Sequence, residues 1–242
     1  EWFGAVGNND TLDESTAIQK AVDFATLGAN KVKLQNKTYY ISHTIVLYNY
    51  ITLEGVASGM YQNYSQTIIS CSEEIDAIRL QGYITEGTEI FTASIKIKDL
   101  QLVGKNMTNN GVKCFAENEH WSWGFNGIKM ENVKASGFAY GFLLYGGSYC
   151  GSLNNTFVDC FFEGNKIGFY VNYSQFDNAF NFVRCGLRKN DWGGALFNQS
   201  STQTLRFESC GIEANGSCSV YPFDSSVGIF GVKVTRDTDM VE

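Results

Sequence analysis

The chain has 242 residues, of which 44% are hydrophobic and 14% aromatic, and its formal net charge is −7 at pH 7. That length and apolar content suit one large domain with a long core. The acidic balance argues against a nucleic-acid partner, which needs a basic stripe, and no apolar run approaches the ~20 residues of a membrane span, so no membrane insertion is expected.

Residues 1–28 contain the one segment with convincing helical periodicity. Thr11-Leu-Asp-Glu14 reads as a capping box, and Gly28 reads as the end of the helix. The apolar face of the helix consists of Ile18, Ala21, Val22 and Ala25. An amphipathic helix at this place is expected to cover the first strand edges and core of the structure that follows.

Residues 29–242 consist of short apolar runs separated by turn residues, a pattern that predicts β-strands. The earliest predicted strands lie at 31–34, 38–42, 51–55, 75–80 and 94–103. No interdomain linker interrupts them. We therefore expect 29–242 to form one continuous domain with the N-terminal cap.

A repeat organises the second half of the chain. Phe157-Val-Asp-Cys, Phe182-Val-Arg-Cys and Phe207-Glu-Ser-Cys begin three similar segments spaced 25 residues apart, and each segment ends on an asparagine. Looser copies begin at Met130 and Ile97. A fixed period of this size predicts a stacked repeat in which each unit contacts its neighbours.

One repeat contains three apolar runs and three bends, which makes it one coil of a single-stranded parallel β-helix with three strands per coil, an all-β fold. Neighbouring coils would stack at roughly 4.8 Å, so equivalent side chains should touch. The predicted inward columns are Ile97, Met130, Phe157, Phe182, Phe207; Leu100, Val133, Cys160, Cys185, Cys210; and Leu102, Ala135, Phe162, Leu187, Ile212. Asn165, Asn190 and Asn215 should form an amide ladder at a turn, where asparagine tolerates a left-handed backbone.

The seven cysteines are interpreted mainly as small buried hydrophobic residues, since three of them occupy an inward column. Their odd number and the lack of a paired framework favour synthesis in a reducing cytoplasm. The spacing matches no zinc motif. No metal or cofactor is expected.

The N-terminal residues resemble those of a known family. Trp2-Phe-Gly-Ala-Val-Gly7, Asp10-Thr11 and Ala17-Ile-Gln-Lys-Ala-Val22 resemble the opening of the pectate-lyase-superfamily β-helix of phage tailspikes and related polysaccharide-degrading proteins. The motifs cover residues 2–72, and the repeat type covers the remainder. Asn8-Asn9 departs from the family's Asp-Gly. The resemblance implies a right-handed β-helix, polysaccharide as partner, a homotrimer, and a virion-tail or extracellular location.

One candidate site lies where loops should meet along one edge of the stacked coils, at 116–125, 147–154, 172–178 and 198–203. These loops carry Glu117, Glu119, His120, Trp121, Trp123, Tyr149, Tyr173, Phe176 and Asp177. Aromatic faces stack on sugar rings, and carboxylates bind hydroxyls or act in catalysis. The alternative is that the tryptophans pack the loops onto the solenoid and the acids are solvated.

A second candidate lies on an outward face, where Glu163, Arg188 and Glu213 share one column, and Asp159 neighbours Arg184 in another. A ladder of ion pairs across strands would explain both, each pair contributing about 0.2–1 kcal/mol. Carboxylates two coils apart could also approach the ~6.5–9.5 Å separation of an inverting glycosidase. Arg188 would lower the pKa of both acids, which suits a base and not an acid.

The resemblance implies a protein that binds and cleaves a bacterial surface or capsular polysaccharide, and our hypothesis for the mechanism is glycoside hydrolysis by two carboxylates. The proposed catalytic acids are Glu117, Glu119, Asp177, Asp159 and Glu163, and the proposed sugar-binding residues are His120, Trp121, Trp123, Tyr149, Tyr173 and Phe176. Two alternatives stay open: a non-catalytic receptor-binding spike, and a lyase acting on an acidic sugar. The polygalacturonase motifs and a pectate-lyase-like calcium cluster are absent from the sequence, so no catalytic role transfers from those enzymes.

Overall fold

The computed structural model describes residues 3–57, 67–81, 92–115, 122–145, 150–174, 176–200 and 204–216, with the short strands 84–85, 88–89 and 232–234. At several strand ends only the backbone is described. The chain begins with helix α1 (Ser15–Thr26), and all other elements are strands. The strands are β1 (Lys31–Lys33), β2 (Thr38–Ile41), β3 (Ile45–Leu47), β4 (Thr52–Glu54), β5 (Ile68–Cys71), β6 (Ile78–Leu80), β7 (Ile84–Thr85), β8 (Thr88–Glu89), β9 (Thr92–Ala93), β10 (Lys96–Val103), β11 (Asn110–Phe115), β12 (Ser122–Asn126), β13 (Lys129–Ser136), β14 (Tyr140–Tyr145), β15 (Cys150–Val158), β16 (Phe161–Glu163), β17 (Ile167–Ser174), β18 (Phe176–Val183), β19 (Gly186–Arg188), β20 (Gly193–Ser200), β21 (Leu205–Glu208), β22 (Gly211–Glu213) and β23 (Val232–Val234).

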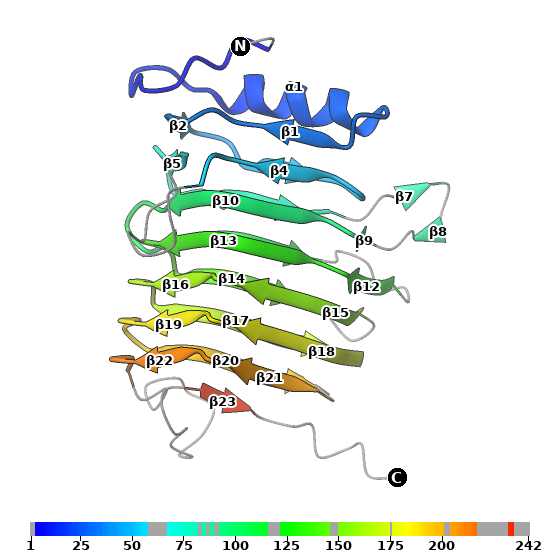
Figure 1. The fold of residues 1–242 in the computed structure, drawn as a ribbon, viewed down its shortest axis with the longest axis vertical. Helices are drawn as coiled ribbons and strands as arrows, with labels where there is room; N and C mark the ends of the chain where they lie inside the picture. The colour runs from blue at the N-terminus through cyan, green and yellow to red at the C-terminus, as the bar shows by residue number, and fades with distance from the viewer. Residues whose placement is uncertain are drawn as a thin grey trace.

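The strands wind into a parallel β-helix, as the repeat predicts (Figure 1). A seven-stranded sheet runs from β3 to β23, and a 14-stranded sheet contains β1, β4, β10, β13, β15 and β18 together with the short strands beside them. All the strand pairs that the structure describes in these two sheets are parallel, whereas β7 and β8 form a separate antiparallel hairpin. Parallel pairing in register follows from a repeat that returns each side chain to the same place one coil later.

The core columns lie in the predicted register. Phe157 pairs with Phe182 and Phe182 with Phe207, and their rings stack with centroids 5.0 and 4.8 Å apart. The expected column of Leu102, Ala135, Phe162, Leu187 and Ile212 is also present. Because each ring contacts its equivalent in the next coil, the same residue type is favoured at every level of the stack.

The asparagine ladder is confirmed, and two of its three members, Asn165 and Asn190, are buried while Asn215 is partly exposed. Asn165 and Asn190 are at most 1% exposed, and the amide of Asn190 accepts from the backbone N–H of Asn165. The left-handed backbone expected at these asparagines lies instead one residue earlier, at Gly164, Lys189 and Ala214. The left-handed residue makes the bend, and the asparagine that follows can then turn its side chain into the core.

Helix α1 covers the first coil, and Ile18, Val22 and Ala25 join the main core (Figure 1). The predicted capping box is wrong. The side chain of Glu14, the N-cap residue, makes no capping bond, and its carboxylate accepts the backbone N–H groups of Val6 and Gly7. Asp13 instead accepts hydrogen bonds from Ser15 and from Ser42 in the coil below. Both acids of the predicted capping box therefore accept hydrogen bonds from residues outside it.

Within the described residues, the side chains of Cys71, Cys160, Cys185 and Cys210 are thiols that form no disulfide. Burial raises the pKa of Cys71 to about 12. A hydrogen bond with Cys160, together with burial, raises the pKa of Cys185. Thiols with raised pKa values stay protonated and unreactive, which fits a packing role. In the part of the chain that is described, no helix is long and apolar enough to cross a membrane.

Candidate functional site

The structure describes the predicted site residues to different extents. Five lie outside the described residues: Glu117, Glu119, His120, Trp121 and Tyr149. Four are described in backbone only: Trp123 in β12, Tyr173 in β17, and Phe176 and Asp177 in β18. Asp159 and Glu163 are described in full.

The edge of the stacked coils where the sequence predicts the loops 116–125, 147–154, 172–178 and 198–203 is partly made of strands. Only residue 175 separates β17 from β18, so 172–178 is not a loop, and β15 already begins at Cys150. Turn-forming residue types suggested loops there, but pairing with the neighbouring coils supplies the backbone hydrogen bonds of a strand. Ser122 pairs with Cys150, and Ser152 pairs with Asp177. The backbones of three coils therefore do lie side by side along this edge.

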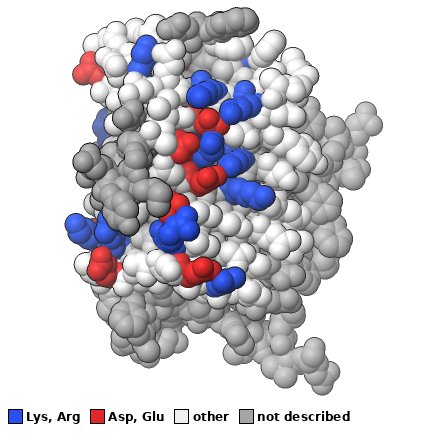
Figure 2. Space-filling view, viewed as in Figure 1, with Lys and Arg blue, Asp and Glu red and all other residues white. Residues whose placement is uncertain are grey.

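Beside that edge, charged side chains gather along the solenoid axis on the outer face of the 14-stranded sheet (Figure 2). We use the name charged strip for two adjacent columns of this face. The first column is Lys31, Thr52, Lys96, Lys129, Thr156, Asn181 and Arg206. The second is Lys33, Glu54, Lys98, Glu131, Val158, Val183 and Glu208. Register thus places a new pair of side chains every ~4.8 Å along the axis.

Ion pairs link the two columns of the charged strip. Lys31 Nζ lies 2.7 Å from Glu54 Oε2, and Lys96 Nζ lies 2.7 Å from Glu131 Oε2. Glu54 also has Lys98 at 3.6 Å. The hydrogen bond from Lys31 lowers the pKa of Glu54, and the nearby lysine charges lower it further. Glu54 is therefore an anion at neutral pH.

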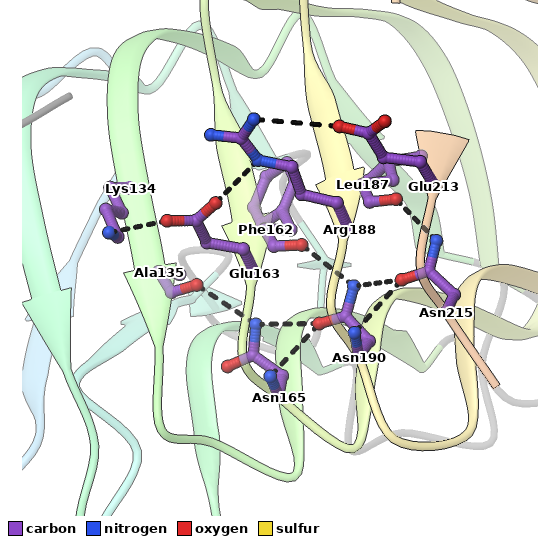
Figure 3. A network of polar contacts seen from close by, with 10 residues as sticks. All are labelled: Lys134, Ala135, Phe162, Glu163, Asn165, Leu187, Arg188, Asn190, Glu213 and Asn215. Atoms are coloured by element: carbon purple, nitrogen blue, oxygen red, sulfur yellow. Dashed lines mark hydrogen bonds and ion pairs between the residues drawn. The ribbon is translucent and has the colours of Figure 1, made fainter. Parts of the chain in front are cut away.

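Glu163 is held by cations from both neighbouring coils (Figure 3). Lys134 Nζ lies 2.6 Å from Oε1 and Arg188 Nε lies 2.7 Å from Oε2, while Arg188 reaches Glu213 at 3.8 Å. Burial raises the pKa of Glu163, but the hydrogen bonds from Lys134 and Arg188 outweigh it, and the net pKa is lowered. The predicted column of Glu163, Arg188 and Glu213 is present.

Asp159 sits at the bend between β15 and β16, with a left-handed backbone. Arg184 in the next coil binds both of its oxygens, with Nε at 2.8 Å and Nη2 at 2.7 Å. The hydrogen bond that Arg184 donates to Asp159 raises the pKa of Arg184. Asp159 and Glu163 are thus paired carboxylates that can accept a proton or a hydrogen bond, and Glu163, with its lowered pKa, is poorly suited to donate a proton.

The Glu163→Gln variant is expected to lose about 1 kcal/mol of stability at neutral pH, because the ion pairs are only partly shielded from water. The folded-state pKa lies below the ordinary value of 4.5, so this stabilisation is present above pH 4.5 and is lost as the pH falls through the folded pKa. Urea denaturation across this range should show the two proteins converging in acid. Glu131→Gln, which removes an exposed acid with one partner, is the control; an equal loss there would contradict a special role for the Glu163 network.

Lys96, Lys129 and Lys134 were not identified from the sequence as site residues. Strand alternation placed them on the outer face, since each neighbours a core position. Their position in columns beside the carboxylates becomes visible only when the register between coils is known. Among the described residues no group of three or more histidines, cysteines and acids is placed to hold a metal ion.

Comparison with known proteins identifies the fold. No protein-family model and no curated protein matches the sequence. The A-module of the mannuronan C-5 epimerase AlgE4 of Azotobacter vinelandii is similar in structure, with a TM-score of 0.53, 17% identity, and coverage of 88% of this chain and 71% of that one. ORF18 of Geobacillus virus E2 has a TM-score of 0.51 and 13% identity, and the match covers 88% of this chain but 59% of that one. The chain is a right-handed parallel β-helix with an N-terminal helical cap.

Proposed function

We propose that this protein binds a bacterial surface or capsular polysaccharide lengthwise along the charged strip and cleaves it by glycoside hydrolysis. The observation that carries the proposal is the register of the outward columns. Coils in register repeat the same donors and acceptors along a straight axis, and a linear sugar chain repeats its hydroxyls in the same way. A strip of this kind suits an extended polymer better than a small ligand enclosed in a cavity.

Along β15 the proposed groups occur in a definite order. Ser152, which pairs with Asp177, comes first, Thr156 of the charged strip follows, and Asp159 lies at the bend directly after the strand. A sugar chain over Thr156 would therefore run between the edge that carries Asp177 and the bend that carries Asp159. In this mechanism the carboxylate pair comes from one end of the strand, because the seven residues from the level of Asp177 to Asp159 span roughly 20 Å, whereas glycoside hydrolysis needs carboxyl groups about 5–9.5 Å apart. Asp177 would act with Glu117 or Glu119 at one edge. At the other end Asp159 would act with Glu163, which Lys134 and Arg188 hold ionised as a base or nucleophile.

The similar structures give the proposal a precedent within the same fold. One of them is an epimerase of the polysaccharide mannuronan, and another is a phage protein. These likenesses support a polysaccharide ligand and a phage-tail or extracellular location for this chain as part of the proposal. Trp121, Trp123, Tyr149, Tyr173, Phe176 and His120 are proposed to contact the sugar, and a homotrimer is the proposed assembly, which sedimentation in solution would test.

Catalysis is tested by replacing all five acids with amides, as Glu117→Gln, Glu119→Gln, Asp159→Asn, Glu163→Gln and Asp177→Asn. Release of reducing ends from a panel of capsular polysaccharides should fall to background, because hydrolysis needs a carboxylate pair. A matched control replaces five exposed acids elsewhere, Asp10, Asp23, Glu73, Glu74 and Asp191, with the same change in net charge. Activity that survives in the first variant would remove the hydrolase mechanism.

Binding without cleavage is the second candidate function. It is favoured by the pairing of both fully described carboxylates, Asp159 with Arg184 and Glu163 with Lys134 and Arg188, which is also what a purely structural ladder would show. This function predicts polysaccharide affinity that falls on Trp121→Ala and no product at any pH. A lyase would instead release products that absorb in the near ultraviolet.

A further inference from the structure

We infer that the outward column of Lys96 and Lys129 is a binding site for the carboxylates of an acidic polysaccharide. This inference rests on the proposed function and names its substrate class. Lys96 and Lys129 belong to the first column of the charged strip. Over seven successive coil levels that column contains lysine, arginine, threonine and asparagine, and it contains no acidic residue.

Within this column, Lys96 and Lys129 stand directly opposite each other on the adjacent parallel strands β10 and β13. Like charges in that position repel and lower stability, and threonine, as at positions 52 and 156 of the same column, would avoid the repulsion. An anion that contacts both ammonium groups would offset the repulsion between the two lysines. An anion over both would replace the repulsion with two charge-assisted hydrogen bonds.

The nearby acids neutralise only one lysine of this pair. Glu131 lies two residues beyond Lys129 on the same strand, and its carboxylate binds Lys96 at 2.7 Å. Glu54 is engaged by Lys31 and Lys98. Lys129 is exposed and makes no ion pair with any described residue, so its ammonium group has solvent as its partner on this face.

The surroundings define the kind of anion. Thr156 and Asn181 continue the column with neutral donors and acceptors, which suit sugar hydroxyls. Glu54, Glu131 and Glu208 occupy the second column of the strip and would repel a polymer that carries charge on every side. A uronic-acid polymer, with one carboxylate per sugar and hydroxyls elsewhere, fits both columns.

The test compares the intact chain with Lys129→Gln, Lys96→Gln and the double variant, using mannuronan and polygalacturonate as acidic probes and dextran as the neutral one. Lys129→Gln should weaken binding of the acidic probes about three- to fivefold, the effect of one exposed ion pair, and the double variant about tenfold or more. Added salt should weaken wild-type binding, and the dependence should be shallower in the variants. Lys189→Gln removes another exposed lysine, at a bend outside the charged strip, and should leave binding unchanged.

The outcomes separate this inference from the proposed function. Dextran bound as tightly as the acidic probes, or equal affinity in wild type and the double variant, would overturn the acidic-substrate assignment while leaving polysaccharide cleavage to stand on reducing-end release. Failure to bind or cleave any polysaccharide would overturn both. Single-stranded DNA bound as tightly as mannuronan, with the same loss in Lys129→Gln, would assign the column to nucleic acid instead.

Discussion

The Phe182→Ala variant is expected to lose about 3–5 kcal/mol of unfolding free energy, the cost of removing a large aromatic side chain from a rigid core. Phe182 is fully buried and lies between the rings of Phe157 and Phe207, with Phe169 packed edge-on at 4.9 Å. The two flanking rings belong to different coils, so a cavity at this level weakens contacts in both directions along the stack. Urea denaturation followed by circular dichroism measures the loss.

Val183→Ala provides the matched control, because Val183 is the next residue of β18 and lies on the outer face. Its truncation should cost about 1 kcal/mol or less. If Phe182→Ala were no more destabilising than Val183→Ala, the coils would not be packed in the register that the structure describes.

The Asn190→Ala variant is expected to lose about 2–4 kcal/mol, because several buried polar groups lose their partners at once. The Asn190 side chain donates to Phe162 O at 3.0 Å and to Asn215 Oδ1 at 2.9 Å, and it accepts from Asn165 N at 3.0 Å (Figure 3). Water cannot replace these bonds, since Asn190 is 1% exposed. Thermal unfolding of the variant measures the effect.

Asn181→Ala tests whether the loss belongs to the ladder, since Asn181 is a partly exposed asparagine one strand earlier. Its truncation should change stability by no more than about 0.5 kcal/mol. Similar melting temperatures for the two variants would mean that the amide ladder contributes nothing beyond an ordinary surface asparagine.

The fold could be predicted from the sequence because a solenoid places equivalent residues in contact. Phe157, Phe182 and Phe207 lie at a fixed period, so the sequence itself records which side chains meet. The capping box failed for the opposite reason. Its residues match a local pattern, but Asp13 and Glu14 are bound by Ser42, Val6 and Gly7, partners that a local pattern cannot reveal.

The candidate site was harder to predict. The ion pairs of Glu163 and Asp159 followed from the 25-residue period, since Arg188 and Arg184 occupy the same columns. Lys96 and Lys129 lie in a longer coil, and side-chain geometry, not sequence spacing, decides that Glu131 binds Lys96 and leaves Lys129 unpaired among the described residues. For these two lysines, pattern and register place both charges on the outer face but do not decide which of them Glu131 binds.

The most direct test of the account is a crystal structure of the protein with a bound mannuronan or polygalacturonate oligosaccharide. We expect the sugar chain to lie parallel to the solenoid axis over β10, β13 and β15, with a carboxylate between Lys96 and Lys129 and a glycosidic oxygen facing the side of Asp159 or Asp177. A sugar chain bound on the seven-stranded sheet or at the helical cap, with the charged strip left empty, would contradict it.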